Sequence, residues 1–99
     1  MKHTRTDDGD LTTLHIEGTL DAVTSPELRG VVEVLVAEHR NNVLLELSGL
    51  RLIDSSGIGV IVMLLKRVRS QGGDVRIQGL CDQPKAIFKL LRLDRVFPL

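Results

Sequence analysis

The spacing of apolar residues changes along the chain, and it predicts the order of the secondary-structure elements. Over residues 11–17 apolar and polar side chains alternate, which is typical of a strand with one buried face. Turn residues around Gly9 precede this segment, and the polar stretch 3–7 before them can form a partner strand. We therefore expect a hairpin of residues 3–7 with residues 11–17 at the start of the chain.

Helical spacing replaces this alternation after a loop at residues 18–21. Ser25 suits the N-cap, Pro26 the first helical position and Glu27 the first turn. Apolar residues then recur at i, i+3, i+4 and i+7, namely Leu28, Val31, Val32 and Leu35. We expect a helix over residues 26–39.

After residue 40 the sequence predicts two more strands and two more helices. The strands and the last helix are described first. Residues 43–47 form a short apolar run between turn residues, which indicates a central strand buried on both faces. Residues 75–78 alternate and predict another strand. Asp82 or Gln83 can cap the third helix, with Pro84 near its first turn.

The apolar run 60–65 is ambiguous on its own, because a short apolar segment fits a strand as well as a buried helix. Over residues 55–71 a longer helical stripe decides for a helix, and its members are Ile58, Ile61, Val62, Leu65 and Val68. Val60, Met63 and Leu64 lie off that stripe, so the first half of this helix is apolar almost all round. Such a helix is either buried or binds a partner, and we expect Met63 to belong to a partner surface.

The elements run strand, strand, helix, strand, helix, strand, helix, and residues 93–97 close the chain as a loop with a short extended end. This order predicts an α/β fold in one domain, residues 1–99, with a mixed β-sheet of about four to five strands layered with three α-helices. Helices between strands favour parallel strands joined by right-handed crossovers.

Composition narrows the class of protein. Apolar residues make up 42% of the 99 residues, which is enough for a core. No apolar run approaches the ~20 residues of a membrane span, and no leader with a cleavage site opens the chain. The single cysteine, Cys81, favours a reducing cytoplasm. Thirteen basic residues balance thirteen acidic ones and Trp and Tyr are absent, so we expect neither nucleic-acid binding nor membrane insertion.

The sequence contains no pattern typical of catalysis or metal binding. His3, His15 and His39 have no ligand spacing, so no metal site is predicted. The hydrolase motif G-x-S-x-G is missing. Gly57-Ile58-Gly59 matches the start of the phosphate-binding motif G-x-G-x-x-G, but Val62 stands where its third glycine would be. We expect these glycines to allow a tight turn and close backbone approach, with a small-ligand site as the alternative. No enzyme activity and no cofactor are predicted.

The stretch Asp54-Ser55-Ser56-Gly57, directly before the apolar helix, is the strongest local signal in the chain. Short polar side chains satisfy the free N–H groups of a helix N-terminus, so the two hydroxyls can be caps. They can also be sites of modification. A phosphate there would carry about −1.5 to −2 charges, which the helix dipole favours but an apolar partner contact does not. The residues alone leave capping and modification open.

Residues 54–60 resemble the D-S-[ST]-G-[IL]-G signature of STAS-domain proteins, specifically the bacterial anti-sigma-factor antagonists. Three other stretches resemble the same family in the same order along the chain: Gly18-Thr19-Leu20-Asp21, Gln71-Gly72-Gly73 and Pro84 through Phe97. The resemblance implies a STAS-like fold over nearly the whole chain. It differs at the C-terminal end, because many members continue into a last helix after the position of Phe97.

The resemblance implies a regulatory domain without catalytic activity. Unphosphorylated members bind an anti-sigma factor that is also a serine kinase of the histidine-kinase-like ATPase type. The kinase phosphorylates the first serine of D-S-S-G, here Ser55, binding weakens, and a PPM-type serine phosphatase reverses the change. By position, the surroundings of Ser55 and the partner surface comprise Asp21, Asp54, Ser56, Gly57, Ile58 and Gly59. The choice of Ser55 over Ser56 rests on the resemblance.

Two alternatives belong to other functional classes. The first is a constitutive STAS scaffold or regulatory subunit of a transporter, secretion or stress complex, which would bind through the same helix without phosphorylation. The second is a small hydrolase that uses Ser55 or Ser56, for which no general base is placed in the sequence.

Overall fold

The computed structural model describes residues 1–97, and the predicted order of elements is confirmed with one additional strand. The elements are β1 (Lys2–Asp8), β2 (Leu11–Leu20), α1 (Ser25–Ala37), β3 (Asn42–Glu46), β4 (Leu50–Ile53), α2 (Ser55–Ser70), β5 (Asp74–Gln78), α3 (Asp82–Leu90) and a single 3₁₀ turn, η1 (Leu93–Arg95). The chain therefore has five strands and three helices within the described part, as the α/β prediction allowed.

The ten-residue strand β2 organises the sheet, because three other strands pair with it. β1 pairs antiparallel with β2 along its whole length, while β3 and β4 both pair with it in parallel. β3 joins residues 11–15 of β2, and β4 joins residues 18–20 after a register shift at Gly18. β5 extends the sheet beyond β3, also in parallel. The result is the expected mixed sheet.

The strand β4 was not predicted as a separate element. Leu50 and Ile53 are buried while Arg51 and Leu52 between them are exposed, so these four residues show no alternation. Their strand character comes from pairing with β2, which is distant in sequence. This pairing positions the start of α2, because β4 leads directly into that helix.

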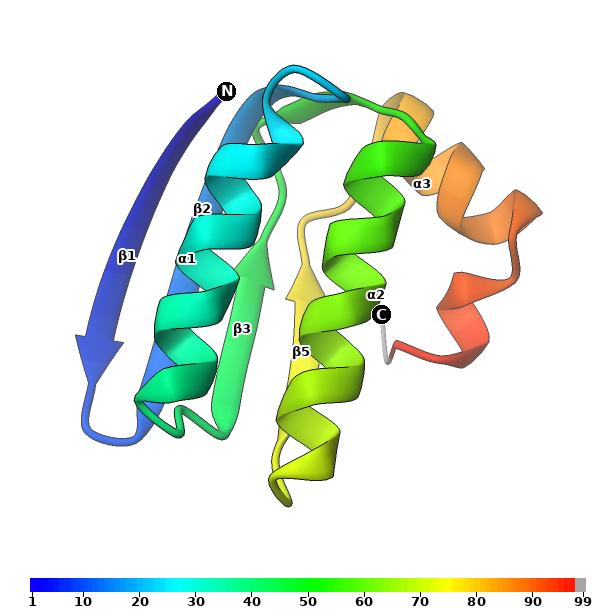
Figure 1. The fold of residues 1–99 in the computed structure, drawn as a ribbon. Coiled ribbons are helices and arrows are strands. Elements are labelled where there is room, and N and C mark those ends of the chain that lie inside the picture. Colours follow the sequence, from blue (N-terminus) through cyan, green and yellow to red (C-terminus); the bar gives the residue numbers. More distant parts are fainter. Residues whose placement is uncertain (98–99) are drawn as a thin grey trace.

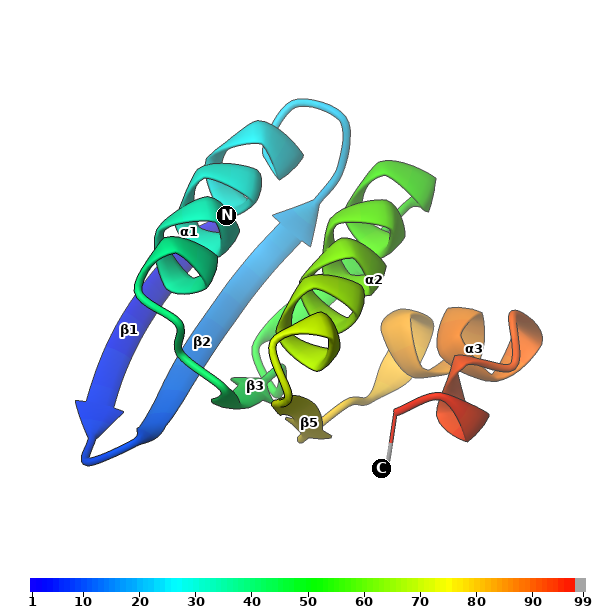
Figure 2. The same ribbon diagram turned by 60° about the horizontal axis from the view of Figure 1, so that its bottom comes forward.

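Helices α1 and α2 lie side by side on one face of the sheet (Figures 1 and 2). Helix α3 contacts β4. Their apolar stripes pack against the inward-facing residues of the strands to form one core. Its largest fully buried side chains are Leu14, Ile16, Leu20, Leu28, Leu35, Leu45, Leu47, Leu50, Ile61, Leu64, Phe88 and Phe97.

The opposite face of the sheet carries half-buried and exposed side chains. In β3, Val43 and Leu45 are fully buried, whereas Leu44 and Glu46 are only half-buried. The prediction that this strand is buried on both faces is therefore wrong. The physical reason is that both right-handed crossovers, through α1 and α2, advance in the same direction across the sheet and so place both helices on the same side.

Two helix caps differ from the predictions. The N-cap of α1 is Thr24 and not Ser25, which is buried in the first turn. The N-cap of α3 is Cys81, so neither Asp82 nor Gln83 caps that helix. Gln83 instead bonds to β4: its Oε1 accepts a hydrogen bond from the Ile53 N–H at 3.0 Å, and its Nε2 donates to the Ile53 carbonyl at 3.0 Å.

The C-terminal segment also differs from its prediction. Leu93–Arg95 form the 3₁₀ turn η1, and Val96, its C-cap, has a right-handed helical backbone, so the predicted loop with an extended end is wrong. Phe97 is fully buried, and its ring centroid lies 6.0 Å from that of Phe88 in α3. This contact anchors the segment to the core.

Candidate functional site

The segment that joins β4 to α2 is the candidate site. Asp54 has an extended backbone and is the N-cap of α2. Its Oδ1 accepts hydrogen bonds from the N–H groups of Ser56 and Gly57, at 2.8 and 3.1 Å. The capping interaction therefore belongs to the carboxylate, which satisfies two of the free N–H groups of the first turn.

The two serine hydroxyls are consequently not needed as caps. Ser55 is the first residue of α2 and is exposed, whereas Ser56 is half-buried. Within residues 1–97 neither hydroxyl takes part in a hydrogen bond between protein groups. This end of α2 thus presents an accessible hydroxyl with no structural task, beside the positive end of the helix dipole.

The two glycines of the motif have different environments. A Cβ atom on Gly57 would lie 2.7 Å from Leu20 Cγ and 2.8 Å from Ile53 Cγ1. Gly57 is therefore required for the first turn of α2 to pack against the ends of β2 and β4. Gly59 is exposed, and a Cβ there would meet no atom within 4 Å. The expected close backbone approach is confirmed at Gly57 only.

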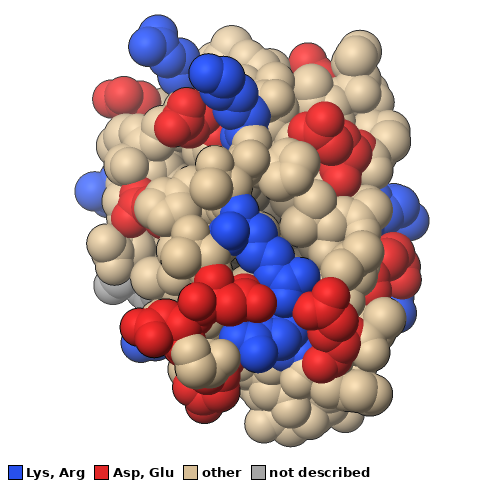
Figure 3. Space-filling model, turned by 90° about the vertical axis from the view of Figure 1, so that its left-hand side faces the viewer, with Lys and Arg blue, Asp and Glu red and all other residues tan. Residues whose placement is uncertain are grey.

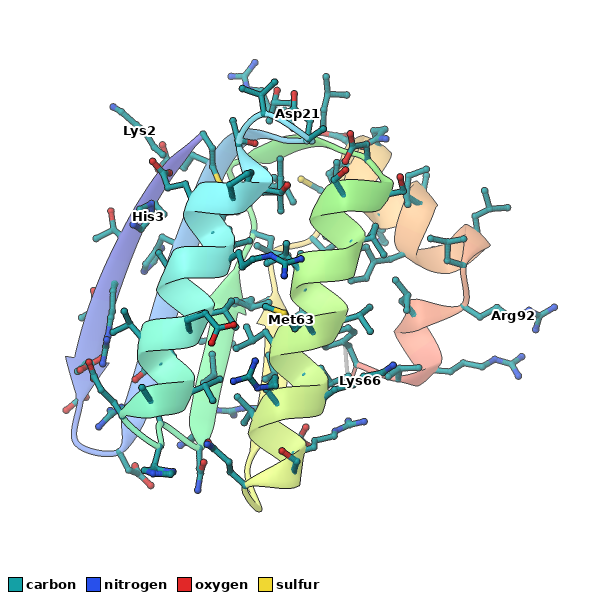
Figure 4. The ribbon with its side chains drawn as sticks, viewed as in Figure 1. Lys2, His3, Asp21, Met63, Lys66 and Arg92 are labelled. Carbon is teal, nitrogen blue, oxygen red and sulfur yellow. The ribbon has the colours of Figure 1, made fainter. Side chains whose placement is uncertain are left out.

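Asp21 lies in the loop between β2 and α1, at the same end of the molecule as the start of α2 (Figures 1 and 4). Its Oδ1 accepts hydrogen bonds from the backbone N–H groups of Val23 and Thr24, at 2.9 and 3.1 Å, and from the Thr24 hydroxyl. The Thr24 N–H is the main cause that lowers the pKa of Asp21. Asp21 therefore orders its own loop and keeps a negative charge near the site.

A backbone contact couples this loop to the motif. The Asp54 N–H donates a hydrogen bond to the carbonyl of Leu20 at 3.2 Å, and Leu20 is the residue directly before Asp21. Val23 in the same loop is 85% exposed, and sequence reasoning missed it because an isolated apolar residue in a loop has no periodic signal. We define the switch surface as Asp21, Val23, Ser55, Gly59 and Met63.

Three members of the switch surface, Ser55, Gly59 and Met63, follow one another at i+4 and so share one face of α2. Figure 4 places Met63 on the side of α2 that faces α1, and the side chain is half-buried. The other two apolar residues off the predicted stripe, Val60 and Leu64, are 2% and 1% exposed and belong to the core.

Ile58, which was also expected at the partner surface, is 9% exposed and packs into the core. Its side chain therefore holds the first turn of α2 to the core, whereas Ser55 and Gly59 on the same turn are exposed. Of the predicted site residues, the structure brings Asp54, Ser55, Ser56 and Gly57 together at one helix end.

The site does not have the form of a catalytic cleft. A hollow of about 860 Å³ near this end is lined by Glu17, Gly49 and Arg51 and contains none of residues 54–59. Within residues 1–97 there is no group of three potential metal ligands. His3 lies against Glu27, with Nδ1 3.2 Å from Oε2, and so it does not approach the serines.

None of the helices in the described residues has the length and apolar character to cross a membrane.

Comparisons with known proteins agree with this architecture. The family model for the STAS domain matches residues 2–99. The anti-sigma-B factor antagonist of Bacillus subtilis is 28% identical over 86 residues, which cover 87% of this chain and 78% of that protein. A Thermotoga maritima structure assigned as an anti-sigma factor antagonist is 25% identical, with a TM-score of 0.89 over 96% of this chain and 82% of that one.

A third similar structure is that of a phosphorylated protein. The Bacillus cell fate determinant SpoIIAA in its phosphorylated form superimposes with a TM-score of 0.78 at 14% identity, over 95% of this chain and 86% of that one. At that identity the likeness concerns the fold. The match of the family model over residues 2–99, together with the mixed sheet and the Asp-Ser-Ser-Gly helix start, shows that the chain belongs to the STAS domain family.

Proposed function

We propose that this protein is an anti-sigma factor antagonist that works as a phosphorylation switch at Ser55. In its unphosphorylated form it binds a cognate anti-sigma factor in the cytoplasm through the switch surface, and phosphorylation weakens that complex. The observation that carries the proposal is that Asp54 caps α2, which leaves the Ser55 hydroxyl exposed and unbonded. The names of the relatives support the class of partner.

The exposure of the two serines supports Ser55 as the acceptor, in addition to the family resemblance. A kinase must bring the acceptor oxygen to the γ-phosphate of ATP, which requires an accessible hydroxyl. Ser55 is exposed, while Ser56 is half-buried on the next position of the helix. SpoIIAA, which shares the fold, exists in a phosphorylated form.

The effect of a phosphate follows from its surroundings. It would add about −1.5 to −2 charges at a helix N-terminus, a position that tolerates negative charge, so the fold should persist. The same charge would add to the carboxylate of the adjacent Asp54 and to that of Asp21, in the loop directly after Leu20, whose carbonyl bonds to the Asp54 N–H. Burying it against a partner that contacts apolar Val23 and Met63 would cost several kcal/mol, or roughly 100-fold or more in affinity.

The proposed enzymes act on the protein and are not part of it. We propose that the anti-sigma factor is itself the kinase, of the histidine-kinase-like ATPase type, and that a PPM-type serine phosphatase restores the binding form. The protein itself would then need to supply only the acceptor hydroxyl, because the kinase brings the base and the ATP.

The direct test is phosphorylation by the cognate anti-sigma factor with ATP, followed by location of the phosphate by mass spectrometry. We expect one phosphate on Ser55 in the wild type and in Ser56→Ala, and none in Ser55→Ala. Phosphate on another residue would contradict the proposal. Stable binding of the kinase without any phosphate transfer would support the constitutive scaffold instead.

A further inference from the structure

Strand β1 is an edge strand with an uncovered outer side. It pairs with β2 at each of its seven residues, and no other strand among residues 1–97 pairs with it (Figure 1). It contains neither proline nor glycine, and its register with β2 has no bulge. Alternate backbone N–H and C=O groups of such a strand point outward, which makes it a template for another strand.

The side chains of β1 that point toward the helices are already bonded within the protein. His3 lies against Glu27 of α1, and Arg5 donates to Glu38 at the end of α1, with Nη2 2.6 Å from Oε1. Arg5 also donates to both carboxylate oxygens of Asp7 at 3.0 Å. These contacts tie β1 to α1 and neutralise Arg5, so that face needs no further partner.

The side chains on the open face of β1 form a different pattern. They are Lys2, Thr4, Thr6 and Asp8, and each is exposed. Within residues 1–97 neither Lys2 nor Asp8 takes part in an ion pair. The strand therefore carries an unpaired positive charge at its start and an unpaired negative charge at its end, with two threonines between them.

The charges of this face are complementary to those of a second β1 strand that runs in the opposite direction. In an antiparallel pair of two β1 strands centred on Arg5, Lys2 of each chain lies opposite Asp8 of the other. Thr4 then lies opposite Thr6, a pair that favours strand association. A parallel pair would instead bring Lys2 against Lys2 and Asp8 against Asp8, which is unfavourable.

We propose that β1 is a self-association edge, at which two copies of the chain pair antiparallel to form one continuous sheet. Charges on edge strands commonly prevent such pairing. Here the sign of the charge reverses along the open face of the strand, so these charges disfavour the in-register parallel pair and favour the antiparallel pair centred on Arg5. Figure 3 looks onto this side of the molecule, where acidic side chains gather toward the lower end around basic ones that run up the middle.

The pairing would leave the switch surface accessible in both copies. Lys2 lies opposite Glu17 near the end of β2, so β1 begins at the end of the sheet where α2 starts. An antiparallel pair places the start of one β1 beside the end of the other. The two switch surfaces would then lie at opposite ends of the dimer, each free to bind a partner.

Strand pairing over seven residues is a small contact compared with the roughly 1,200–2,000 Å² of stable interfaces. We therefore expect a weak dimer that forms in the upper micromolar range or above and depends on salt. Sedimentation equilibrium at low ionic strength should show the mass rising from 10.9 kDa toward twice that value with concentration. At about 0.5 M NaCl dimerisation should weaken tenfold or more, because the exposed charge pairs are screened.

Charge reversal tests the pairing scheme. Lys2→Asp and Asp8→Lys should each abolish dimerisation, because each places like charges opposite one another. A mixture of these two variants should form heterodimers, since one chain is then acidic at both positions and the other is basic at both. The double variant, in which the two charges are exchanged, should dimerise like the wild type. Lys66→Asp, an exposed reversal on α2, is the matched control and should leave dimerisation unchanged.

A wild-type chain that remains at 10.9 kDa at about 1 mM and low salt would overturn the proposal. So would a mixture of the two single variants that fails to associate while both keep the wild-type melting temperature. Neither result bears on Ser55, because the measurement involves no kinase.

Discussion

At the scale of single residues, four residues of the segment 54–59 have separate structural roles. Asp54 caps the helix, Ser55 presents a free hydroxyl, and Gly57 lets the helix end approach the sheet. Gly59 leaves a bare position one turn above Ser55. A different residue at any of these places would therefore affect a different property of the site.

The two glycines provide a matched pair for testing this division. Gly57→Ala should reduce the free energy of unfolding by roughly 1–3 kcal/mol, because the new methyl group would overlap the Leu20 side chain. Gly59→Ala meets no atom and removes a flexible residue from a helix, so it should stabilise by about 0.5–1 kcal/mol. Urea unfolding measures both. Equal effects of the two changes would show that the packing at Gly57 is not tight.

At the scale of elements, the position of α2 depends on contacts between segments that are distant in sequence. Its start is held by β4, which pairs with β2, and β4 is held on its other side by Gln83 from α3. The amide of Gln83 bonds to both main-chain groups of Ile53, in the way that a neighbouring strand would. The helix α3 thus completes the edge of the sheet immediately before the motif.

Removal of this amide should loosen that edge. Gln83→Ala leaves the N–H and C=O of Ile53 without these partners, and we expect a loss of about 1–3 kcal/mol in the free energy of unfolding. Hydrogen exchange at the Ile53 amide should accelerate. Lys85→Ala, at an exposed position of the same helix, is the control and should change neither quantity appreciably. Unaltered exchange at Ile53 in Gln83→Ala would contradict this role of α3.

At the scale of the whole molecule, the proposed switch acts on binding and not on the fold. The core is separate from the exposed hydroxyl, and a helix N-terminus tolerates negative charge. The signal would then be a change in the electrostatic character of one end of a rigid domain.

Substitutions that separate charge from size test this mode of action. Ser55→Asp should weaken binding of the cognate kinase by roughly tenfold or more, while Ser55→Asn, which adds a side chain of the same shape without the charge, should have a much smaller effect. Both variants should keep the wild-type circular dichroism spectrum and a melting temperature within a few degrees of it. If Ser55→Asp and Ser55→Asn lose affinity equally, the loss is due to the size of the new side chain and not to its charge. If Ser55→Asp alone unfolds the protein, the switch is not confined to the surface.

The sequence was sufficient for those features that depend on neighbours along the chain. The stripe of α2 and the alternation in β2 and β5 reflect local spacing, so these elements appear within a few residues of their expected bounds. The helix start at residues 54–57 was also evident, because a helix start is a local signal.

The tertiary structure alone decided the features that depend on competition between distant groups. β4 is a strand only through its pairing with β2, and Leu44 faces outward because both crossover helices pack on the other side of the sheet. Val60 and Leu64 are buried by elements that their own spacing does not reveal. The sequence left capping and modification open at Ser55. The structure assigns the cap to Asp54, because that carboxylate reaches the free N–H groups of α2 once β4 and β2 hold its backbone in place.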